Sequence, residues 1–380
     1  MPALAPHIPA VPASGIRRLF EVAEEIGGEI TMLALGEPSV AIAPHIAAAA
    51  VEAWELDDTN YAPNGGILPL RQAIQAKLAS TNQITAGLDQ IWVTVGATQA
   101  LYQALTATLA AGDEVLIPNP GYTTFTMAPR MLQAVPVGYS LRPELDFMPD
   151  FEELERLVTP RTRVLIVNSP SNPLGVVFGA STLRALLAFA KRHDLWVISD
   201  EVYEHFTFGS EHVSIASLDD DDRVFTAYSL SKSYAMTGIR VGYLVTPPGF
   251  APTFRTLQEA TISCVSVPGQ RAGVAAITGP SADLIATREG YRENLRMCTA
   301  MLRGRGFEFL QPQGAFYLWV NLSHASEGNV AAWAERFLRE HRIAVAPGSA
   351  FGTEGEGWIR ICLAGSAEAL EHCIQSLPVP

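Results

Sequence analysis

Residues 224–242 read VFTAYSLSKSYAMTGIRVG. An apolar run, Val224–Tyr228, ends at small hydroxyl residues that flank Lys232, and Arg240 follows eight positions later. A lysine in an apolar setting has a lowered pKa, so its neutral and nucleophilic amine becomes accessible, as Schiff-base chemistry requires. The serine hydroxyls and Arg240 suit a nearby phosphate. The alternative is an ordinary corner between two strands whose lysine is exposed, because a short motif needs structural context.

The chain on either side of this stretch alternates between short apolar runs and helical patterns. The runs expected to form strands are Ile91–Val95, Glu114–Ile117, Ala134–Tyr139, Arg163–Asn168, Leu195–Ser199, Val224–Tyr228 and Val241–Val245. Helical patterns at Thr98–Ala110, Phe151–Val158 and Leu183–His193 separate many of them. Several runs are apolar throughout, as expected for strands buried on both faces. The alternation predicts an α/β fold, with a three-layer large domain around a mostly parallel sheet of about seven strands.

The two ends of the chain have a different pattern. Helical spacing is present at Gly15–Ile26 and Ala43–Leu56, with a short apolar strand at Ile30–Leu35 between them. A long helical region, Gln270–Arg303, leads to a tail in which strands and helices mix. We therefore predict a large domain over residues 46–270. Residues 1–45 and 271–380 are expected to form a smaller α+β domain, with residues 271–303 as a long connecting helix.

Composition excludes several classes of protein. The chain has 380 residues, of which 48% are hydrophobic and 17% charged, and its net charge is −13. An acidic chain lacks the basic face that a nucleic acid or an anionic membrane would require. The four cysteines show no metal-ligand spacing, which favours buried thiols in a reducing compartment and no metal site. No signal peptide or lipid-facing helix is indicated, so we expect a cytoplasmic protein. The acidic loop Asp219–Asp222 is expected only to be solvated.

Polar side chains follow several of the expected strands, where open α/β sheets bind their ligands. The sequence Gly96-Ala97-Thr98-Gln99 opens a helix directly after a strand, so its backbone N–H groups could bind an anion. The alternative is a plain turn with Thr98 as the N-cap. Asn172 follows another strand in a rigid Pro/Gly turn and could donate to a phenolic oxygen. It could equally cap its own backbone.

Two charged residues are placed where burial would be costly without a partner. Asp200 ends a buried strand and could meet a protonated ring nitrogen, with Tyr203 reaching the same ligand. It could instead be a helix cap or a member of a structural ion pair. Arg360 lies inside an apolar strand and could bind a substrate carboxylate or an internal acidic residue. Tyr122, in a Pro/Gly loop, could stack on a ligand or fill the core.

In combination, these segments resemble the class I/II aminotransferases, the pyridoxal-phosphate enzymes of fold type I, and most of all their aspartate/aromatic branch. The resemblance covers nearly the whole chain. The segments that carry it are Leu35–Pro38, Tyr61 with the Gly65-Gly66 turn, Gly96–Gln99, Asn172–Gly175, Asp200–Tyr203, Ser229–Lys232, Gly238–Arg240 and Arg360.

The resemblance implies a role for each of these residues. Lys232 would hold pyridoxal 5′-phosphate as an internal aldimine and move a proton at the reacting carbon, while Asp200 would pair with the ring nitrogen. The other implied cofactor contacts are Asn172 and Tyr203 to the phenolic oxygen, Tyr122 on the ring, and Ala97, Thr98, Ser229 and Arg240 at the phosphate, with Ser231 as a further aid. Arg360 would bind the substrate carboxylate, with Asn172 and the backbone of Gly36 beside it.

The resemblance also implies partners and a reaction. Tyr61 would reach the phosphate of the neighbouring subunit, which implies a homodimer with shared active sites and a small domain that closes over substrate. An L-amino acid would pass its amino group to a 2-oxo acid, 2-oxoglutarate or pyruvate, by a ping-pong mechanism. A second arginine for a side-chain carboxylate is not evident; Arg17, Arg18 and Arg271 are candidates by position only.

Two other functions are compatible with parts of this pattern. A lyase, a cyclising synthase or an oxidase could use the same cofactor and the same residues, because a fold does not determine the reaction. A binding or regulatory protein could carry the fold without catalysis. The acidic charge and the completeness of the motifs argue against a regulator that binds DNA.

Overall fold

The computed structural model describes residues 4–380, and its centre is a seven-stranded, mostly parallel sheet. The strands lie in the order β2-β8-β7-β6-β5-β3-β4, and only β8 runs antiparallel to its neighbours. Their bounds are β2 (Ile91–Thr94), β3 (Glu114–Asn119), β4 (Val135–Ser140), β5 (Thr162–Asn168), β6 (Trp196–Asp200), β7 (Val224–Ser229) and β8 (Gly242–Val245). The predicted α/β class and the mostly parallel sheet of seven strands are confirmed.

Burial explains why these segments read as unbroken apolar runs. The central strands β5, β6 and β7 have almost no exposed residue. Helix α4 (Gly96–Thr108) contacts β6, β7 and β8, while α5 (Thr124–Met131) and α6 (Phe151–Leu157) contact β4. Helix α7 (Ala180–Arg192) contacts β6. Strands covered in this way have no solvent face, so apolar and polar residues do not alternate along them.

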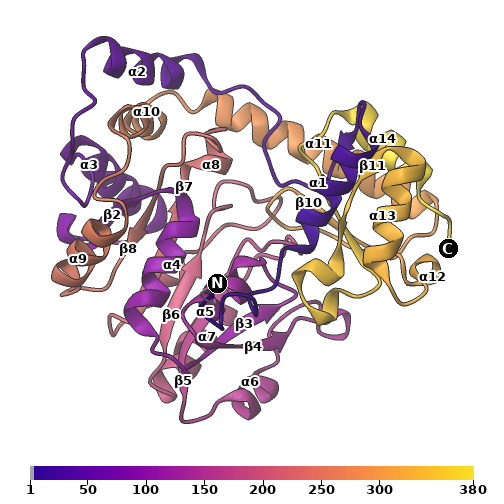
Figure 1. The fold of residues 1–380 in the computed structure, drawn as a ribbon, viewed down its shortest axis with the longest axis horizontal. Helices are drawn as coiled ribbons and strands as arrows, with labels where there is room; N and C mark the ends of the chain where they lie inside the picture. Colours follow the sequence, from indigo (N-terminus) through magenta and orange to yellow (C-terminus); the bar gives the residue numbers. More distant parts are fainter. Residues whose placement is uncertain (1–3) are drawn as a thin grey trace.

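Helices near the β2–β8 edge enclose a second hydrophobic core. It lies beneath α2 (Pro44–Glu55), α3 (Leu68–Lys77) and α10 (Val267–Thr278), and α10 packs against both of the others. The short helix α8 (Leu230–Ser233) follows β7, and α9 (Ala251–Thr261) precedes α10. Figure 1 shows α2, α3, α9 and α10 together on one side of the molecule.

A smaller sheet forms the other side of the molecule. Its strand order is β12-β13-β10-β9, all antiparallel, with bounds β9 (Phe309–Leu310), β10 (Tyr317–Asn321), β12 (Ala346–Pro347) and β13 (Trp358–Cys362). The helices of this region are α11 (Ala282–Gly304), α12 (Ser323–Ser326), α13 (Val330–His341) and α14 (Ala367–Ser376). The predicted smaller domain with strands and helices mixed is therefore present.

The N-terminal segment packs with this C-terminal region. Helix α1 (Gly15–Ile26) contacts α13, and β1 (Thr31–Met32) pairs in parallel with β11 (Ile343–Ala344). In Figure 1 the indigo α1 accordingly lies among the yellow elements, although more than three hundred residues separate the two segments.

Three sequence-based expectations require correction. The single connecting helix over residues 271–303 is two helices, α10 and α11, because Gly279-Pro280 interrupts the helical hydrogen bonds between them. The strand expected over Ile30–Leu35 is only the two-residue β1. Helices α5 and α9 were not predicted. The domain boundaries after residues 45 and 270 stay predictions.

Two further properties bear on the class of protein. Within residues 4–380, no helix is both long enough and apolar enough to cross a bilayer. All four cysteines are free thiols; three are buried and Cys264 is half-buried.

Candidate active site

A cavity of about 220 Å³ lies at the carboxyl ends of the parallel strands, between the large sheet and the smaller one. It is lined by the sequence-predicted residues Gly36, Ala97, Thr98, Tyr122, Asn172, Asp200, Tyr203, Ser229, Ser231, Lys232, Arg240 and Arg360. The structure therefore brings together every predicted site residue except Tyr61 and the three candidate arginines Arg17, Arg18 and Arg271. Ile16, Leu35, Leu101 and Tyr317 also line the cavity and were not predicted as site residues.

Lys232 extends from the short helix α8 into this cavity. Burial lowers the pKa of its ammonium group to about 8. Its Nζ donates a hydrogen bond to the carbonyl oxygen of Gly36, at 2.6 Å. The alternative of an exposed corner lysine is excluded, and an amine with this pKa is partly neutral near neutral pH.

Asp200 is the last residue of β6, and only 4% of it is exposed. Burial raises the pKa of its carboxyl group to about 7, and the nearby charge of Glu201 adds to the rise. Its Oδ1 accepts a hydrogen bond from the backbone N–H of Val202, at 3.3 Å, so it does cap the turn that follows the strand. It forms no ion pair within residues 4–380. A buried carboxyl group in this condition is suited to a cationic partner.

Arg360 lies on β13 and is 3% exposed. Its guanidinium donates to Oδ1 of Asn172, at 2.7 Å, and to the carbonyl oxygen of Ala34. Its Nε has no hydrogen-bond partner, and no carboxylate pairs with it in the described part of the chain. The alternative of an internal acidic partner is therefore excluded. A buried, uncompensated guanidinium beside a cavity favours an anionic ligand.

Asn172 does not cap its own turn. That function belongs to Asn168, whose Oδ1 accepts the backbone N–H of Asn172 at 2.8 Å. The side chain of Asn172 is consequently available to the cavity. Because its Oδ1 already accepts from Arg360, its amide nitrogen is the part left to donate to a ligand.

Backbone and hydroxyl donors gather at the far end of the cavity, where α4 begins. Gly96 has a φ of +69°, and a Cβ there would lie 2.6 Å from an Arg240 nitrogen, so only glycine fits. Ala97 and Thr98 follow in the first turn of a thirteen-residue helix. Ser229 caps α8 through its Oγ, and Arg240 donates to the carbonyl oxygen of Thr237 at 2.8 Å. A helix N-terminus with a cation beside it is suited to phosphate.

Tyr203 and Tyr317 meet at the boundary between the two sheets. Their hydroxyl oxygens are 2.7 Å apart, and both side chains are buried. Tyr122 lies half-buried on the cavity wall, with its ring edge-on to Phe125. The sequence did not identify Tyr317 as a site residue because it begins the apolar run of β10, where an aromatic residue is typical of the hydrophobic core.

The remaining predicted residues lie away from the cavity. Tyr61 is 91% exposed and lines a separate surface groove with Trp54 and Cys264. Arg18 pairs with glutamates on the surface, at 3.3 Å from Glu335, and Arg271 pairs with Asp58. Arg17 is exposed on α1. None of these three arginines lines the cavity.

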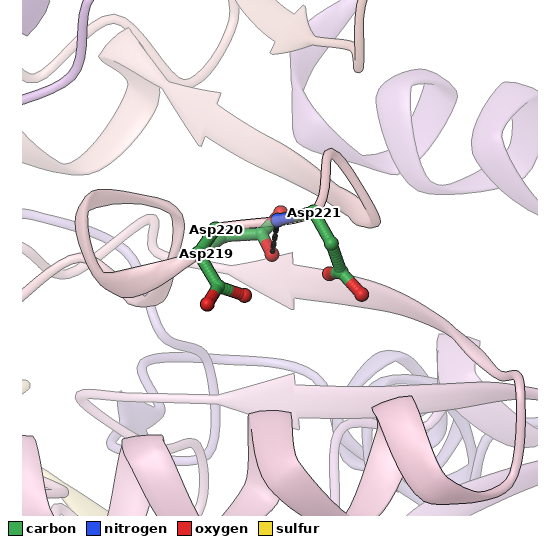
Figure 2. A group of neighbouring side chains, drawn as sticks. All are labelled: Asp219, Asp220 and Asp221. Carbon is green, nitrogen blue, oxygen red and sulfur yellow. Dashed lines mark hydrogen bonds between the residues drawn. The ribbon is translucent and has the colours of Figure 1, made fainter.

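The acidic loop is more structured than expected. Asp219, Asp220 and Asp221 lie close together (Figure 2), and the N–H of Asp221 donates to Oδ1 of Asp219 at 3.3 Å. Asp219 also accepts from the N–H groups of Arg223 and Val224, at the start of β7. The other carboxylates pair with Arg223 and Lys191. Asp219 thus caps the start of β7, and Asp220 and Asp221 pair with cations, so the expectation of a merely solvated loop was wrong.

Comparison with known proteins shows the family to which the chain belongs. The family model "Aminotransferase class I and II" matches residues 29–377. The chain is 35% identical to an aromatic-amino-acid aminotransferase 2 of Thermococcus litoralis and 36% identical to an aspartate aminotransferase of Pyrococcus abyssi. Each match covers 99% of this chain and 97% of the relative. A solved aspartate aminotransferase of Thermus thermophilus with maleate superposes with a TM-score of 0.93, at 32% identity, covering 99% of both chains.

The fold is α/β, and one cavity is lined by a buried amine, a buried acid and a guanidinium that pairs with no carboxylate within residues 4–380. The chain belongs to the class I and II aminotransferases. It is an enzyme that transfers amino groups, and the lyase, synthase and oxidase alternatives are not favoured.

Proposed function

We propose that this aminotransferase binds pyridoxal 5′-phosphate in the cavity and uses Lys232 as its catalytic amine. The observation that carries the proposal is the convergence of three groups on one space: an amine with a lowered pKa, a buried acid, and a buried guanidinium without a carboxylate. Each is costly to bury without a partner. A ligand with an aldehyde, a basic ring nitrogen and a phosphate, joined by a substrate carboxylate, would satisfy all of them.

The residues fit this cofactor at each of its ends. The first turn of α4, with Ser229 and Arg240, would hold the phosphate. Asp200 would accept a hydrogen bond from the protonated ring nitrogen, and Tyr203 and the amide of Asn172 would donate hydrogen bonds to the phenolic oxygen. Tyr122 would lie against the ring. Bound pyridoxal phosphate supplies an aldehyde that condenses with amines and a protonated ring that withdraws electrons from the reacting carbon.

The protein's own groups then perform three tasks. Arg360 binds the α-carboxylate of the substrate and orients its α-carbon. The Nζ of Lys232 would accept the proton from the α-carbon of the donor in one half-reaction and deliver a proton to the α-carbon of the acceptor in the other, which its lowered pKa makes efficient near neutral pH. Asp200, as an anion, keeps its partner nitrogen protonated throughout. The amino group leaves in one half-reaction and returns in the other, as ping-pong kinetics require.

The cavity supports a donor whose side chain carries no charge. Among residues 4–380, the cations that line it are Lys232, Arg240 and Arg360, and each already has a proposed role. The apolar side chains of Ile16 and Leu35 are also part of the lining. A carboxylate buried without a cation is unfavourable by several kcal/mol. We therefore expect an aromatic or other neutral L-amino acid to be preferred to aspartate, as the name of the Thermococcus relative also suggests.

A donor panel tests both parts of the proposal. Purified enzyme with pyridoxal phosphate is assayed with phenylalanine, tyrosine, leucine and aspartate, each with 2-oxoglutarate or pyruvate as acceptor. Phenylalanine or tyrosine should exceed aspartate in kcat/KM by on the order of 100-fold. Equal turnover of aspartate would contradict the donor assignment. Repeated turnover without any 2-oxo acid, beyond the single half-reaction that ping-pong kinetics allow, would instead contradict transamination.

We further propose that two chains share their active sites. Large apolar side chains are exposed together on and beyond α2: Trp54 is 62%, Leu56 72% and Tyr61 91% exposed. Covering such side chains with a second copy would remove apolar surface from water. In such a dimer, Tyr61 would reach the phosphate-binding end of the partner subunit's cavity. The free thiols support a reducing compartment, so we expect a cytoplasmic location for this homodimer.

Mixing two inactive variants tests the shared site. The variants Tyr61→Ala and Lys232→Ala damage residues that a shared site would take from different chains. In a mixed dimer one site would carry both defects and the other neither. Mixing after mild dissociation should therefore restore activity that neither parent shows. Persistent inactivity of a mixture shown by mass spectrometry to contain mixed dimers would contradict the composite site.

A further inference from the structure

Tyr317 connects the two parts of the cavity that come from different sheets. It is the first residue of β10, it is 1% exposed, and it lies opposite Cys362 of β13. The guanidinium of Arg360, two residues along β13, lies over its ring with Cζ 4.2 Å from the ring centroid. A cation over an aromatic face is attracted by the negative charge of that face, and more strongly where water is excluded. The ring of Tyr317 thus contacts a cation that pairs with no carboxylate within residues 4–380.

The hydroxyl group of Tyr317 has a second task. It lies 2.7 Å from the hydroxyl of Tyr203, which follows β6 of the large sheet. Burial raises the pKa of both phenols, so both keep their protons. Each hydroxyl has one proton to donate. If Tyr203 donates its proton to a ligand oxygen in the cavity, its own oxygen must accept the proton of Tyr317. The direction of this hydrogen-bond chain is then fixed from Tyr317 through Tyr203 to the ligand.

The backbone near Gly36 leaves space for this arrangement. A Cβ at residue 36 would lie 2.0 Å from the hydroxyl oxygen of Tyr317 and 2.9 Å from its Cζ. Any side chain there would displace the hydroxyl from Tyr203. The carbonyl oxygen of the same glycine accepts from Lys232. Tyr317 therefore packs among the residues assigned to chemistry.

We infer that Tyr317 is a positioning residue that links two groups of the site. One is Arg360, which binds the substrate carboxylate, and the other is Tyr203, which donates a hydrogen bond to the phenolic oxygen of the cofactor. Its ring orients the guanidinium, and its hydroxyl orients and polarises the hydroxyl of Tyr203. The inference rests on the proposed function, because it assumes pyridoxal phosphate beside Tyr203. Tyr317 acts through Arg360 and Tyr203 and does not itself touch the reacting atoms.

Two substitutions at this residue separate the two tasks. Tyr317→Phe keeps the ring and removes the hydroxyl, whereas Tyr317→Leu removes both. The matched control is Phe351→Leu, since the Phe351 ring also lies under Arg360, with Cζ at 4.7 Å, but carries no hydroxyl. Each protein is loaded with pyridoxal phosphate and titrated with pH by visible absorbance. The KM for the preferred amino acid and the thermal unfolding of each apoprotein are measured alongside.

The hydroxyl and the ring should affect different measurements. A weaker donor at Tyr203 stabilises negative charge on the ring oxygen less well. Tyr317→Phe should therefore raise the pH midpoint of the absorbance change by roughly 0.3–1 unit, while KM changes less than about twofold. Tyr317→Leu should show the same upward change and also raise KM by roughly 5- to 30-fold. Phe351→Leu should raise KM without moving the midpoint.

The outcomes that contradict the inference differ from those that contradict the proposed function. If wild-type enzyme binds the cofactor and transaminates, but Tyr317→Phe has an unchanged midpoint, the coupling is wrong. An equal midpoint change in Phe351→Leu would show a general disturbance of the cavity and would also refute it. If the wild-type protein binds no pyridoxal phosphate, the proposed function fails and the inference fails with it. Loss of thermal stability in Tyr317→Phe equal to that in Tyr317→Leu would assign the hydroxyl a structural role and contradict the inference.

Discussion

Replacement of Glu204 tests a buried ion pair in the large domain. Glu204 pairs with Lys77, the last residue of α3, and their side chains are 8% and 10% exposed. Asn82 also donates to Glu204, at 2.7 Å. Burial alone would raise the pKa of this carboxyl group, but the charges of Lys77 and of two neighbouring histidines hold it to about 2. The pair ties α3 to the segment that follows β6 and Asp200.

The expected magnitude follows from the burial of both partners. Glu204→Gln leaves the Lys77 ammonium buried without a counter-ion, which typically costs about 3–5 kcal/mol of unfolding free energy. The pKa of Glu204 is depressed in the folded protein from 4.5 to about 2. Its contribution is therefore complete above about pH 4.5 and is lost as the pH falls through 2. This lowering of the pKa corresponds to roughly 3 kcal/mol of unfolding free energy, in agreement with the range of about 3–5 kcal/mol expected for the buried ion pair.

Denaturant unfolding of the apoprotein measures this effect. The wild type and Glu204→Gln are compared at pH 7 and again between pH 4.5 and 2.5, where their difference should shrink. The control is Glu335→Gln, because Glu335 pairs with Arg18 on the surface and such pairs contribute little. Adding Lys77→Met to Glu204→Gln should restore part of the lost stability. A loss below about 1 kcal/mol at pH 7, or one that Glu335→Gln equals, would refute the reasoning.

Two further predictions concern the cavity itself. Burial lowers the pKa of Lys232 to about 8. The rate at which the apoprotein captures pyridoxal phosphate should therefore rise with pH and level off above pH 8. A rate that still rises at pH 10 would contradict the assignment of Lys232 as the reacting amine. At pH 7 about one Lys232 amine in ten should be neutral, against one in several thousand for an exposed lysine. Gly36→Ala should destabilise the protein by about 1–3 kcal/mol and raise KM, because the new Cβ meets the Tyr317 hydroxyl. The control Gly290→Ala, in open space on α11, should be neutral or stabilising in the same thermal unfolding assay, and an equal loss there would contradict the steric argument.

The sequence was most informative where one physical constraint dominates. Strands buried on both faces must be apolar throughout, so β5, β6 and β7 were recognisable within a residue or two at each end. Parallel strands place their carboxyl ends at one edge, which is why Asn172 and Asp200 could be expected near Lys232. Arg360 was recognisable because a charge inside an apolar strand requires an anionic partner.

The failures have equally specific causes. The dipeptide Gly279-Pro280, which typically ends a helix, marks the break between α10 and α11. The helical spacing of apolar residues on both sides of it nevertheless favoured a single helix. Helix α5 contains Pro129, which reads as a helix breaker. Tyr317 carries no local signal at all, since its importance depends on Arg360 and Tyr203, residues that only the tertiary fold brings near it.

Lysine chemistry offers the most direct test of the central claim, since the chain contains only three lysines: Lys77, Lys191 and Lys232. Lys191 is 54% exposed and serves as an internal control for surface reactivity, while Lys77 is buried against Glu204. The measurement is borohydride reduction of the protein with pyridoxal phosphate, followed by peptide mapping. We predict one pyridoxyl group per chain, on the peptide that contains Lys232. A label on Lys191 or Lys77 instead, or no label after reduction, would contradict the account.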